Sequence, residues 1–230
     1  MQPMTSTTGT AATTTSTGVP AGRRRQARSA AVREALLDAA LDEFSAHGFE
    51  AASTRTIATA AGTHQPQINY HFASKEDLWK ATVDHLFARL DAAVAQELAT
   101  EPARPGDRGQ FADSLRAFVH AAAGLPQLNR IMVQEATTDS ERLQWIVERH
   151  TRPRFDLITG QWRKLRDAGV VADIDEAVLY YSLVGAASLA YVNAPEARLL
   201  GFDTLSDSFI EAHADALVGV FLGPNRATDR

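Results

Sequence analysis

The segment of residues 53–80 restricts the fold of this chain more than any other part of the sequence. It reads STRTIATAAGTHQPQINYHFASKEDLWK. A short helix is predicted to begin after Ser53 or Thr54, because either hydroxyl can cap the free N–H groups of a first turn, and to end at Gly62. Ala58 is small, which lets the next helix cross this one closely at a steep angle.

A second short helix is predicted over residues 65–70. Pro66 falls in its first turn, where a missing N–H is harmless, and Ile68 is its one clear apolar residue before Tyr70. A helix this short and polar is not stable alone. We therefore expect Ile68 to point inward and its polar neighbours to point out, with longer helices holding the short one in place.

One such longer helix is predicted over residues 29–47, where apolar residues recur at helical spacing. Gly48 ends it by supplying a left-handed cap, which allows Phe49 to fold back on Phe44.

The other longer helix is predicted to open at Ser74, where Asp77 can complete a capping box. Its apolar positions continue for about 25 residues, until Pro102, Pro105 and Gly106 break the pattern. This helix would join the front element to everything behind it, and is the natural lever between them.

The rest of the chain also shows helical spacing, without a convincing strand pattern or an internal repeat. Pro153 lies inside one helical run and is predicted to kink or split it, and Asp173 with Glu176 is predicted to form a cap. The predicted fold is all-α, with about nine helices. The helices expected behind the front element cover residues 110–123, 126–137, 139–168, 177–193 and 206–222.

The composition excludes several functional classes. Zero cysteines rule out disulfides, thiol nucleophiles and thiolate metal sites, and fit a reducing cytoplasm. No apolar run reaches the roughly 18 residues of a membrane span. The seven histidines form no H-E-x-x-H pattern, and no G-x-S-x-G or G-x-G-x-x-G motif occurs. We expect a cytoplasmic protein that is not an enzyme and has no cofactor, no metal and no membrane contact.

The charge of the chain is unevenly distributed. Residues 1–75 hold seven Lys/Arg and five Asp/Glu, a balance of +2, whereas the remainder holds 16 basic and 23 acidic residues, a balance of -7. Nucleic-acid binding depends on local potential, so an overall charge of -5 does not exclude it. The alternative interpretation is that the acidic excess serves only solubility.

The two ends of the chain are predicted to be tails. Residues 1–22 contain eight threonines and no charged side chain, so they cannot bury enough apolar surface to fold alone. Arg23, Arg24, Arg25 and Arg28 follow. They fit either an arm that grips phosphates or a narrow minor groove, or a solubilising cluster in front of a helix.

Residues 29–80 resemble the tetracycline-repressor (TetR) family of bacterial regulators. The resemblance is carried by a helix ending in FSAHGF, then TRTIATAAG, then INYHFASKEDL. Behind residue 80 the likeness is limited to the number and order of helices. It implies a tail over residues 1–25, a helix-turn-helix DNA-binding domain over 26–74, a helical ligand-binding and dimerisation domain over 75–223, and a tail over 224–230.

The resemblance also implies which residues meet DNA. Thr54 and Arg55 begin the supporting helix, where members touch phosphate and sometimes a base. Many members have tyrosine where this chain has Asn69, a departure that removes a phosphate contact or provides a shorter side chain able to reach a base. The front of the recognition helix holds Gln65, Pro66 and Gln67, and the positions that commonly contact phosphate hold Tyr70, His71 and Lys75.

The chemistry of these side chains agrees with that assignment. Glutamine offers a donor and an acceptor together, which suits adenine, and arginine suits guanine. We expect Arg55 and residues 65–69 to read sequence, and Tyr70, His71 and Lys75 to position the protein on phosphates. The alternative for any one of them is an ordinary exposed polar residue.

Two-fold symmetry is expected because one recognition helix reads few base pairs. Small residues cluster over residues 185–190, and the last helix carries Phe209, Leu217 and Val220. These last two helices, paired with a second chain's copies, would form a four-helix bundle and make a homodimer. An intramolecular core is the alternative.

The rear helices would also surround an effector site, for which an apolar or amphipathic small molecule is the default ligand. Aromatic residues at helical spacing belong to a core more often than to a pocket. The candidate ligand-binding residues are Phe87, Phe118, Met132, Glu135, Trp145, His150, Trp162 and Tyr181.

These patterns together predict a sequence-specific DNA-binding transcriptional regulator. We expect a homodimeric repressor that a small-molecule effector releases from its double-stranded DNA operator. The competing interpretation is an all-helical small-molecule-binding or scaffolding protein without specific DNA binding.

Overall fold

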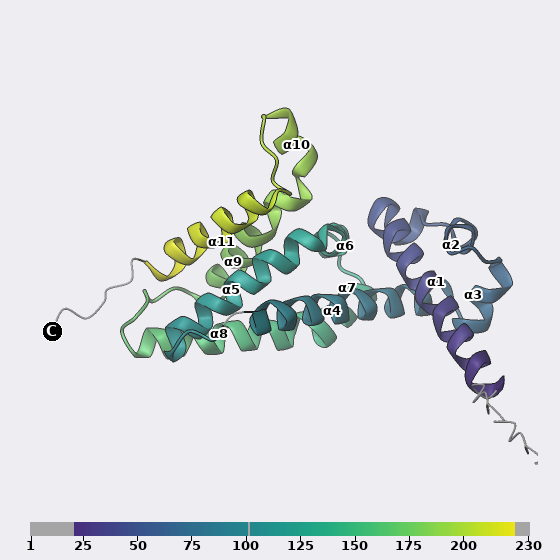
Figure 1. Ribbon diagram of the computed structural model, residues 1–230, viewed down its shortest axis with the longest axis horizontal. Coiled ribbons are helices and arrows are strands. Elements are labelled where there is room, and N and C mark those ends of the chain that lie inside the picture. The colour runs from purple at the N-terminus through teal and green to yellow at the C-terminus, as the bar shows by residue number, and fades with distance from the viewer. Residues whose placement is uncertain (1–20, 101, 224–230) are drawn as a thin grey trace, which may run out of the picture.

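Helix α4 (Lys75–Thr100) connects the two parts of the molecule. In the computed structural model, which describes residues 21–100 and 102–223, helices α1 to α3 gather around its first turns and the remaining helices lie along the rest of it (Figure 1). The described residues contain helices and no strand, which confirms the all-α prediction. No described helix is long and apolar enough to span a membrane.

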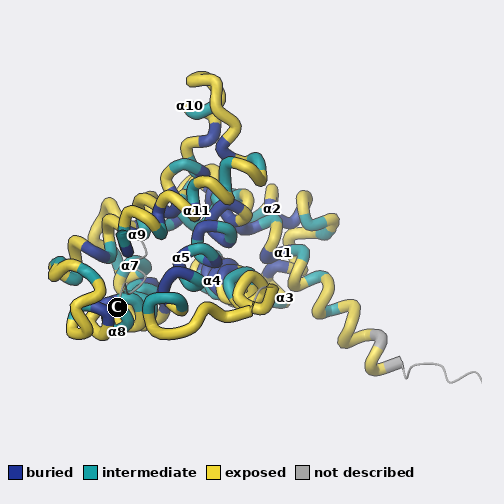
Figure 2. Tube along the Cα trace, turned by 60° about the vertical axis from the view of Figure 1, so that its left-hand side comes forward, coloured by how far each residue is buried: buried dark blue, intermediate teal, exposed yellow. Residues whose placement is uncertain are grey.

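Helix α1 (Ala21–Ala51) is longer than expected at its start. Residues 21–25, which we assigned to the N-terminal tail, are helical, and this first part of α1 extends away from the body (Figure 2), with Arg23 and Arg25 exposed. The predicted tails over residues 1–20 and 224–230 lie outside the described residues.

The predicted break at Gly48 is confirmed. Gly48 has φ 72°, a left-handed conformation that favours glycine, and a short helical stretch continues beyond it to Ala51. The rings of Phe44 and Phe49 stack with their centroids 6.2 Å apart. The chain therefore turns sharply at the end of α1 and presents Phe49 and Glu50 near the start of α4.

Helices α2 (Thr54–Ala60) and α3 (Gln65–His71) follow closely the predicted bounds. The Ser53 hydroxyl caps α2 by accepting a hydrogen bond of 3.3 Å from the Thr56 N–H. Gly62 has φ 65° in the turn between the two helices.

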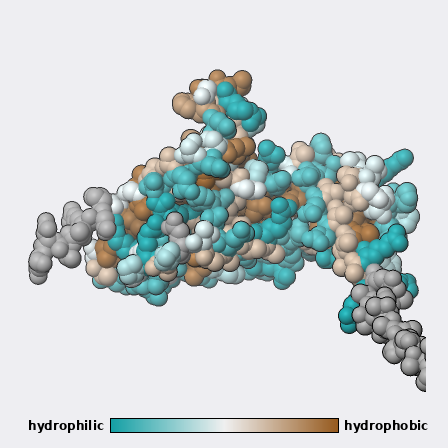
Figure 3. All heavy atoms as spheres, viewed as in Figure 1, coloured by the Kyte–Doolittle hydropathy of each residue, from teal (hydrophilic) through white to brown (hydrophobic). Residues whose placement is uncertain are grey.

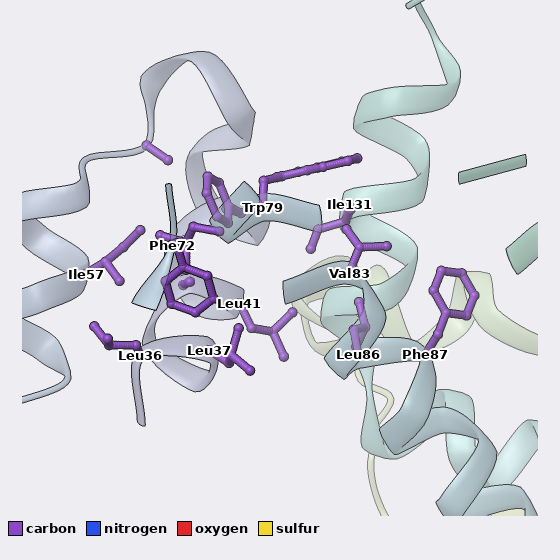
Figure 4. Close-up of a cluster of buried hydrophobic side chains, with 14 of the residues drawn as sticks. Leu36, Leu37, Leu41, Ile57, Phe72, Trp79, Val83, Leu86, Phe87 and Ile131 are labelled. Atoms are coloured by element: carbon purple, nitrogen blue, oxygen red, sulfur yellow. The ribbon is translucent and has the colours of Figure 1, made fainter. Parts of the chain in front are cut away.

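A first hydrophobic cluster holds the front helices to α4. Trp79 and Val83 of α4 pack against residues of α1, α2 and α6 (Pro126–Ala136), which Figure 4 shows converging on one centre. The labelled members are Leu36, Leu37, Leu41, Ile57, Phe72, Trp79, Val83, Leu86, Phe87 and Ile131.

A second cluster lies further back, between α5 (Gly106–Gly124), α8 (Arg152–Asp167), α9 (Glu176–Val192) and α11 (Asp207–Leu222). Phe118 packs against both clusters, so the two cores are in contact. The helices behind α4 match the predicted order.

The long helical run around Pro153 is interrupted, as predicted. Helix α7 (Glu141–Ile146) passes through a π-helical turn, Val147–Thr151, into α8, whose first turn contains Pro153. Proline cannot donate the backbone hydrogen bond that a continuous α-helix requires, and wider turns of this kind accommodate such a break.

Two expectations about the rear helices are wrong. Asp175 rather than Asp173 caps α9, because its carboxylate accepts hydrogen bonds from the N–H groups of Ala177 and Val178 at 2.9 and 3.2 Å. An additional short helix, α10 (Ala194–Leu199), was not expected, and it projects from the body between α9 and α11 (Figure 1).

Candidate nucleic-acid interface

Helix α3 is held at the surface by one apolar side chain. Ile68 is 3% exposed and belongs to the first hydrophobic cluster, whereas Tyr70 is 71% exposed. Gln65, Pro66, Gln67 and Asn69 are also exposed. The predicted orientation is therefore confirmed, and the polar edge of α3 is available to a partner.

The starts of α2 and α3 lie next to each other. The Gln65 amide donates a hydrogen bond of 3.4 Å to the hydroxyl of Thr54. Thr54 itself is half-buried. Arg55 is exposed and lines an open groove of about 380 Å³ together with Thr56, Thr59 and Ala60. These positions place amide, hydroxyl and guanidinium groups on one continuous surface.

The end of α3 is close to a basic side chain of α1. The Arg33 guanidinium lies 5.4 Å from the centroid of the Phe72 ring, and the rings of Tyr70 and His71 are 5.0 Å apart. Burial, and then the nearby charge of Arg33, lower the pKa of His71. Arg33 was not among the predicted interface residues, because its proximity to α3 results from the packing of α1 and leaves no local motif in the sequence.

Lys75 stands at the first turn of α4 beside the corner that follows α1. Its ammonium donates a hydrogen bond of 3.1 Å to the backbone carbonyl of Glu50 and lies 5.0 Å from the centroid of the Phe49 ring. The side chain is half-buried. Lys75 is thus held in a defined position and still reaches the surface.

The predicted cap of α4 is present in a modified form. The Ser74 hydroxyl accepts a hydrogen bond of 3.0 Å from the Asp77 N–H. It donates one of 2.9 Å to the Asp77 carboxylate, which therefore binds the serine side chain rather than the serine N–H. The exposed N-terminal end of α4 is favourable to an anion such as phosphate.

The arginines at the start of α1 extend this basic surface. Arg23, Arg25 and Arg28 are exposed on the projecting helical turns. These arginines, which fit either a DNA-gripping arm or a solubilising cluster, lie on an extension of α1 where the structure describes them.

The predicted effector residues do not form one group. Phe87 belongs to the first cluster, and Trp162 belongs to the second. Phe118, Met132 and Trp145 pack against the first cluster. Tyr181 is 74% exposed, so the expectation that it faces an internal cavity is wrong for the single chain.

The two predicted polar effector residues are engaged inside the protein. Glu135 is 7% exposed and binds the Arg142 guanidinium at 3.2 Å. His150 is buried, its ring stacks on Phe87 at 4.2 Å, and its Nε2 lies 2.9 Å from the Asp84 carboxylate. Burial lowers the pKa of His150, although Asp84 acts in the opposite direction.

A cavity of about 370 Å³ lies elsewhere, between α9, α10 and α11, with Leu189, Phe202 and Phe209 among its lining residues. None of the eight predicted effector residues lines it. Within residues 21–100 and 102–223, no group of three or more His, Asp and Glu side chains is arranged to hold a metal ion.

An exposed polar helix, held edge-first by two supporting helices in front of a larger helical domain, defines a helix-turn-helix DNA-binding regulator. Residues 36–82 match the model of the bacterial regulatory proteins of the tetR family. The front of this chain is therefore a DNA-binding domain of the TetR family of bacterial transcriptional regulators.

The wider comparisons agree with this assignment. The transcriptional regulator RutR of Escherichia coli is 29% identical over 192 residues, covering 81% of this chain and 85% of RutR. The crystal structure of AibR in complex with isovaleryl coenzyme A and operator DNA has a TM-score of 0.62 and 20% identity, covering 84% of this chain and 99% of AibR. FadR of Bacillus subtilis in complex with stearoyl-CoA has a TM-score of 0.58 and 14% identity, covering 80% and 97%. These two structures show a shared fold.

Proposed function

We propose that the chain is a homodimeric repressor that reads its operator with α3 and leaves it when a small-molecule effector binds behind α4. The observation that carries the proposal is the orientation of α3, in which Ile68 alone is buried and the polar edge is exposed. A protein helix that enters the major groove needs this arrangement, because base edges are read by hydrogen bonds from side chains. A regulator of this kind works where the bacterial DNA is, in the cytoplasm.

The interface divides into reading and positioning residues. Gln65, Gln67 and Asn69 carry amides that can match a donor and an acceptor on adenine, and Arg55 suits guanine. Tyr70, His71 and Lys75 lie toward the end of α3 and the start of α4. There they can hold phosphates and set the register of α3 without reading sequence.

Exposed apolar side chains on α9 and α11 support the homodimer. Val178 and Tyr181 of α9 and Val220 of α11 are all more than half exposed in the single chain. The surface view shows further apolar residues on the projecting α10 segment (Figure 3). Large exposed apolar side chains mark interaction surfaces, and pairing these helices across a two-fold axis would form a four-helix bundle.

In the dimer, the two copies of α3 would lie about 34 Å apart, one turn of DNA. An effector changes DNA affinity only through its different affinity for the bound and the released states. Helix α4 reaches from the first cluster to the rear helices, so we propose that its displacement changes the separation of the two α3 helices.

Three unpaired polar atoms support an effector site beside α8. Thr151 Oγ1, Thr159 Oγ1 and Trp162 Nε1 are buried and have no hydrogen-bond partner among the described residues. Buried polar groups without partners are unusual and are favourable points for a ligand. Trp162 is also one of the predicted effector residues, and its ring packs 5.5 Å from that of Phe111. The surrounding cluster is apolar, which suits an amphipathic small molecule.

Fluorescence anisotropy with DNA from upstream of the coding region tests the function. We expect binding that resists competitor DNA and weakens with salt. Gln65→Ala should reduce discrimination between the operator and a mutated site by about 1–3 kcal/mol. Lys75→Ala should weaken binding to all sequences and reduce the salt dependence by about one counterion.

The matched control is Gln144→Ala on α7, which also removes an exposed amide from a helix but lies behind α4. It should bind like the parent. A parent protein that shows no competitor-resistant binding would instead favour the all-helical scaffolding or small-molecule-binding alternative. If the parent binds specifically and neither Gln65→Ala nor Lys75→Ala changes that binding, the assignment of the site residues is refuted and the proposed function is not.

A further inference from the structure

We propose that Arg142 of α7 is a positioning residue for DNA binding, which acts on Lys75 through the ring of Phe49. The inference rests on the proposed function, because it takes Lys75 as a phosphate contact. It adds a side chain of the rear domain to the machinery that sets DNA affinity.

The Phe49 ring is shared by two cations. The carbon at the centre of the Arg142 guanidinium lies 4.0 Å from the ring centroid, and the Lys75 ammonium lies 5.0 Å from the same centroid. A cation within about 6 Å of an aromatic centroid is attracted by the ring's negative face. Arg142 and Lys75 come from different helices, α7 and the first turn of α4, and both of them touch Phe49.

The neighbouring residue Glu50 joins the same arrangement. Its backbone carbonyl accepts the hydrogen bond from Lys75 at 3.1 Å, and its carboxylate lies 3.6 Å from the Arg142 guanidinium. Arg142 and Lys75 are therefore both attached to the corner formed by Phe49 and Glu50. The corner follows Gly48, whose left-handed backbone sets its direction.

Arg142 is itself anchored in the rear domain. Its Nε donates a hydrogen bond of 3.2 Å to the carboxylate of Glu135 on α6. Glu135 is nearly fully buried, and a buried carboxylate is stabilised by a charged partner. The guanidinium also lies 5.8 Å from the Trp79 ring of α4.

The planar guanidinium makes Arg142 suited to this role. It can stack on Phe49 with its flat face while its edge binds Glu135, and a lysine ammonium offers no such plane. A shift of α7 relative to α1 would move the Phe49–Glu50 corner or remove Arg142 from it. Either change would alter the position of the Lys75 ammonium, and would therefore weaken its contact with a DNA phosphate.

A double-mutant cycle measured by anisotropy on the upstream DNA tests this positioning. Arg142→Lys keeps the charge and a partner for Glu135 but removes the planar group, and we expect DNA affinity to fall about two- to fivefold, as for one exposed cation–π contact. In a Lys75→Ala background the same substitution should cause no further loss, because the side chain that it positions is gone.

Arg149→Lys is the matched control. Arg149 is a charged residue of the same helical run that binds Asp84 rather than the Phe49–Glu50 corner, so its substitution should leave DNA affinity unchanged. Phe49→Leu is a second route, since it removes the shared ring. It should cause a similar loss and should not add to that of Arg142→Lys, with thermal melting confirming that each variant is folded.

The outcomes separate the inference from the proposed function. Additive losses from Arg142→Lys and Lys75→Ala, or no loss from Arg142→Lys, would overturn the positioning role while leaving a specific DNA binder. Specific binding that Lys75→Ala does not weaken would overturn it as well. Absence of competitor-resistant binding by the parent protein would overturn the proposed function and this inference together.

Discussion

Ile68 decides which face of α3 meets the solvent. It is the buried residue of a seven-residue helix, so its side chain fixes the rotation of α3 about its own axis. The amides at positions 65, 67 and 69 are exposed as a consequence. A short helix has little stability of its own, so the packing of Ile68 and the adjacent Phe72 into the first cluster is what holds the reading edge in place.

Ser74 is the residue at which a stability effect is most easily isolated. Ser74→Ala removes the hydroxyl that accepts from the Asp77 N–H, and loss of such a cap is expected to lower the free energy of unfolding by about 1 kcal/mol. Urea denaturation followed by circular dichroism measures this change.

The matched control for this prediction is Ser114→Ala. The Ser114 hydroxyl only bonds back to the Gln110 carbonyl within α5, an interaction that does not stabilise a helix. Equal unfolding midpoints for the two variants would show that the Ser74 cap contributes little.

Local contacts could be predicted from the sequence, and distant ones could not. The caps by Ser53 and Ser74 and the turn at Gly48 depend on neighbours within a few residues, and all three are present. The positions of Arg33 beside His71 and of Arg142 above Phe49 depend on how separate helices pack. No spacing in the sequence encodes these two contacts.

The π-helical turn Val147–Thr151 contacts α4 through the side chains of Arg149 and His150. It places His150 against Phe87 and Asp84 of α4, and Arg149 binds the same Asp84 carboxylate at 2.6 Å. Pro153 predicted an interruption here, but not its form, because kinked, split and π-helical arrangements all satisfy a missing donor.

His150 should make the stability of the fold depend on pH. Burial lowers its pKa in the folded protein below the ordinary value of 6.5, so the unfolded chain binds more protons as the pH falls. The free energy of unfolding is therefore unaffected by the titration of His150 above about pH 6.5 and decreases as the pH falls below that value. The slope is at most about 1.4 kcal/mol per pH unit for one proton. His71 and His213 act in the same direction.

His150→Gln isolates this contribution, since glutamine can still donate to Asp84 but does not titrate in this range. Urea denaturation at pH 8 gives the cost of the substitution itself, and the series down to pH 5 gives the pH dependence. We expect the variant to lose less stability than the parent over that series. Parallel curves for the two proteins would show that His150 is not the group responsible.

At the scale of the whole molecule, two hydrophobic clusters are linked by Phe118 of α5, which packs against both. The order of the helices could be predicted because apolar spacing repeats along each one. An effector cavity could not, because aromatic residues with the same spacing fill a core, as Phe87 and Trp162 do. Helix α10 was missed because it has only six residues and most of them are exposed, so it shows no apolar spacing.

Val220 tests whether two copies associate through α9 and α11. It is 74% exposed, so Val220→Asp should not disturb the single chain, but it would place a charge in the proposed bundle. Analytical ultracentrifugation should show a shift from dimer to monomer. DNA affinity should fall by about a hundredfold, because the two DNA-binding domains are no longer linked to each other.

Val133→Asp is the comparison, because Val133 is also more than half exposed but lies on α6, which is not one of the two helices of the proposed bundle. It should remain dimeric. A Val220→Asp protein that sediments like the parent would place the association surface elsewhere.

The contact of Arg142 with Phe49 has a practical consequence for anyone building hybrid sensors. A chimera that joins the front helices of this chain to a relative's rear domain, with its junction at the start of α4, would separate Phe49 from the arginine stacked on it. Such a hybrid would keep its reading helix and lose the side chain that steadies its corner. Transferring Arg142 and Glu135 together with the front helices would retain both the arginine that stacks on Phe49 and the carboxylate that anchors this arginine.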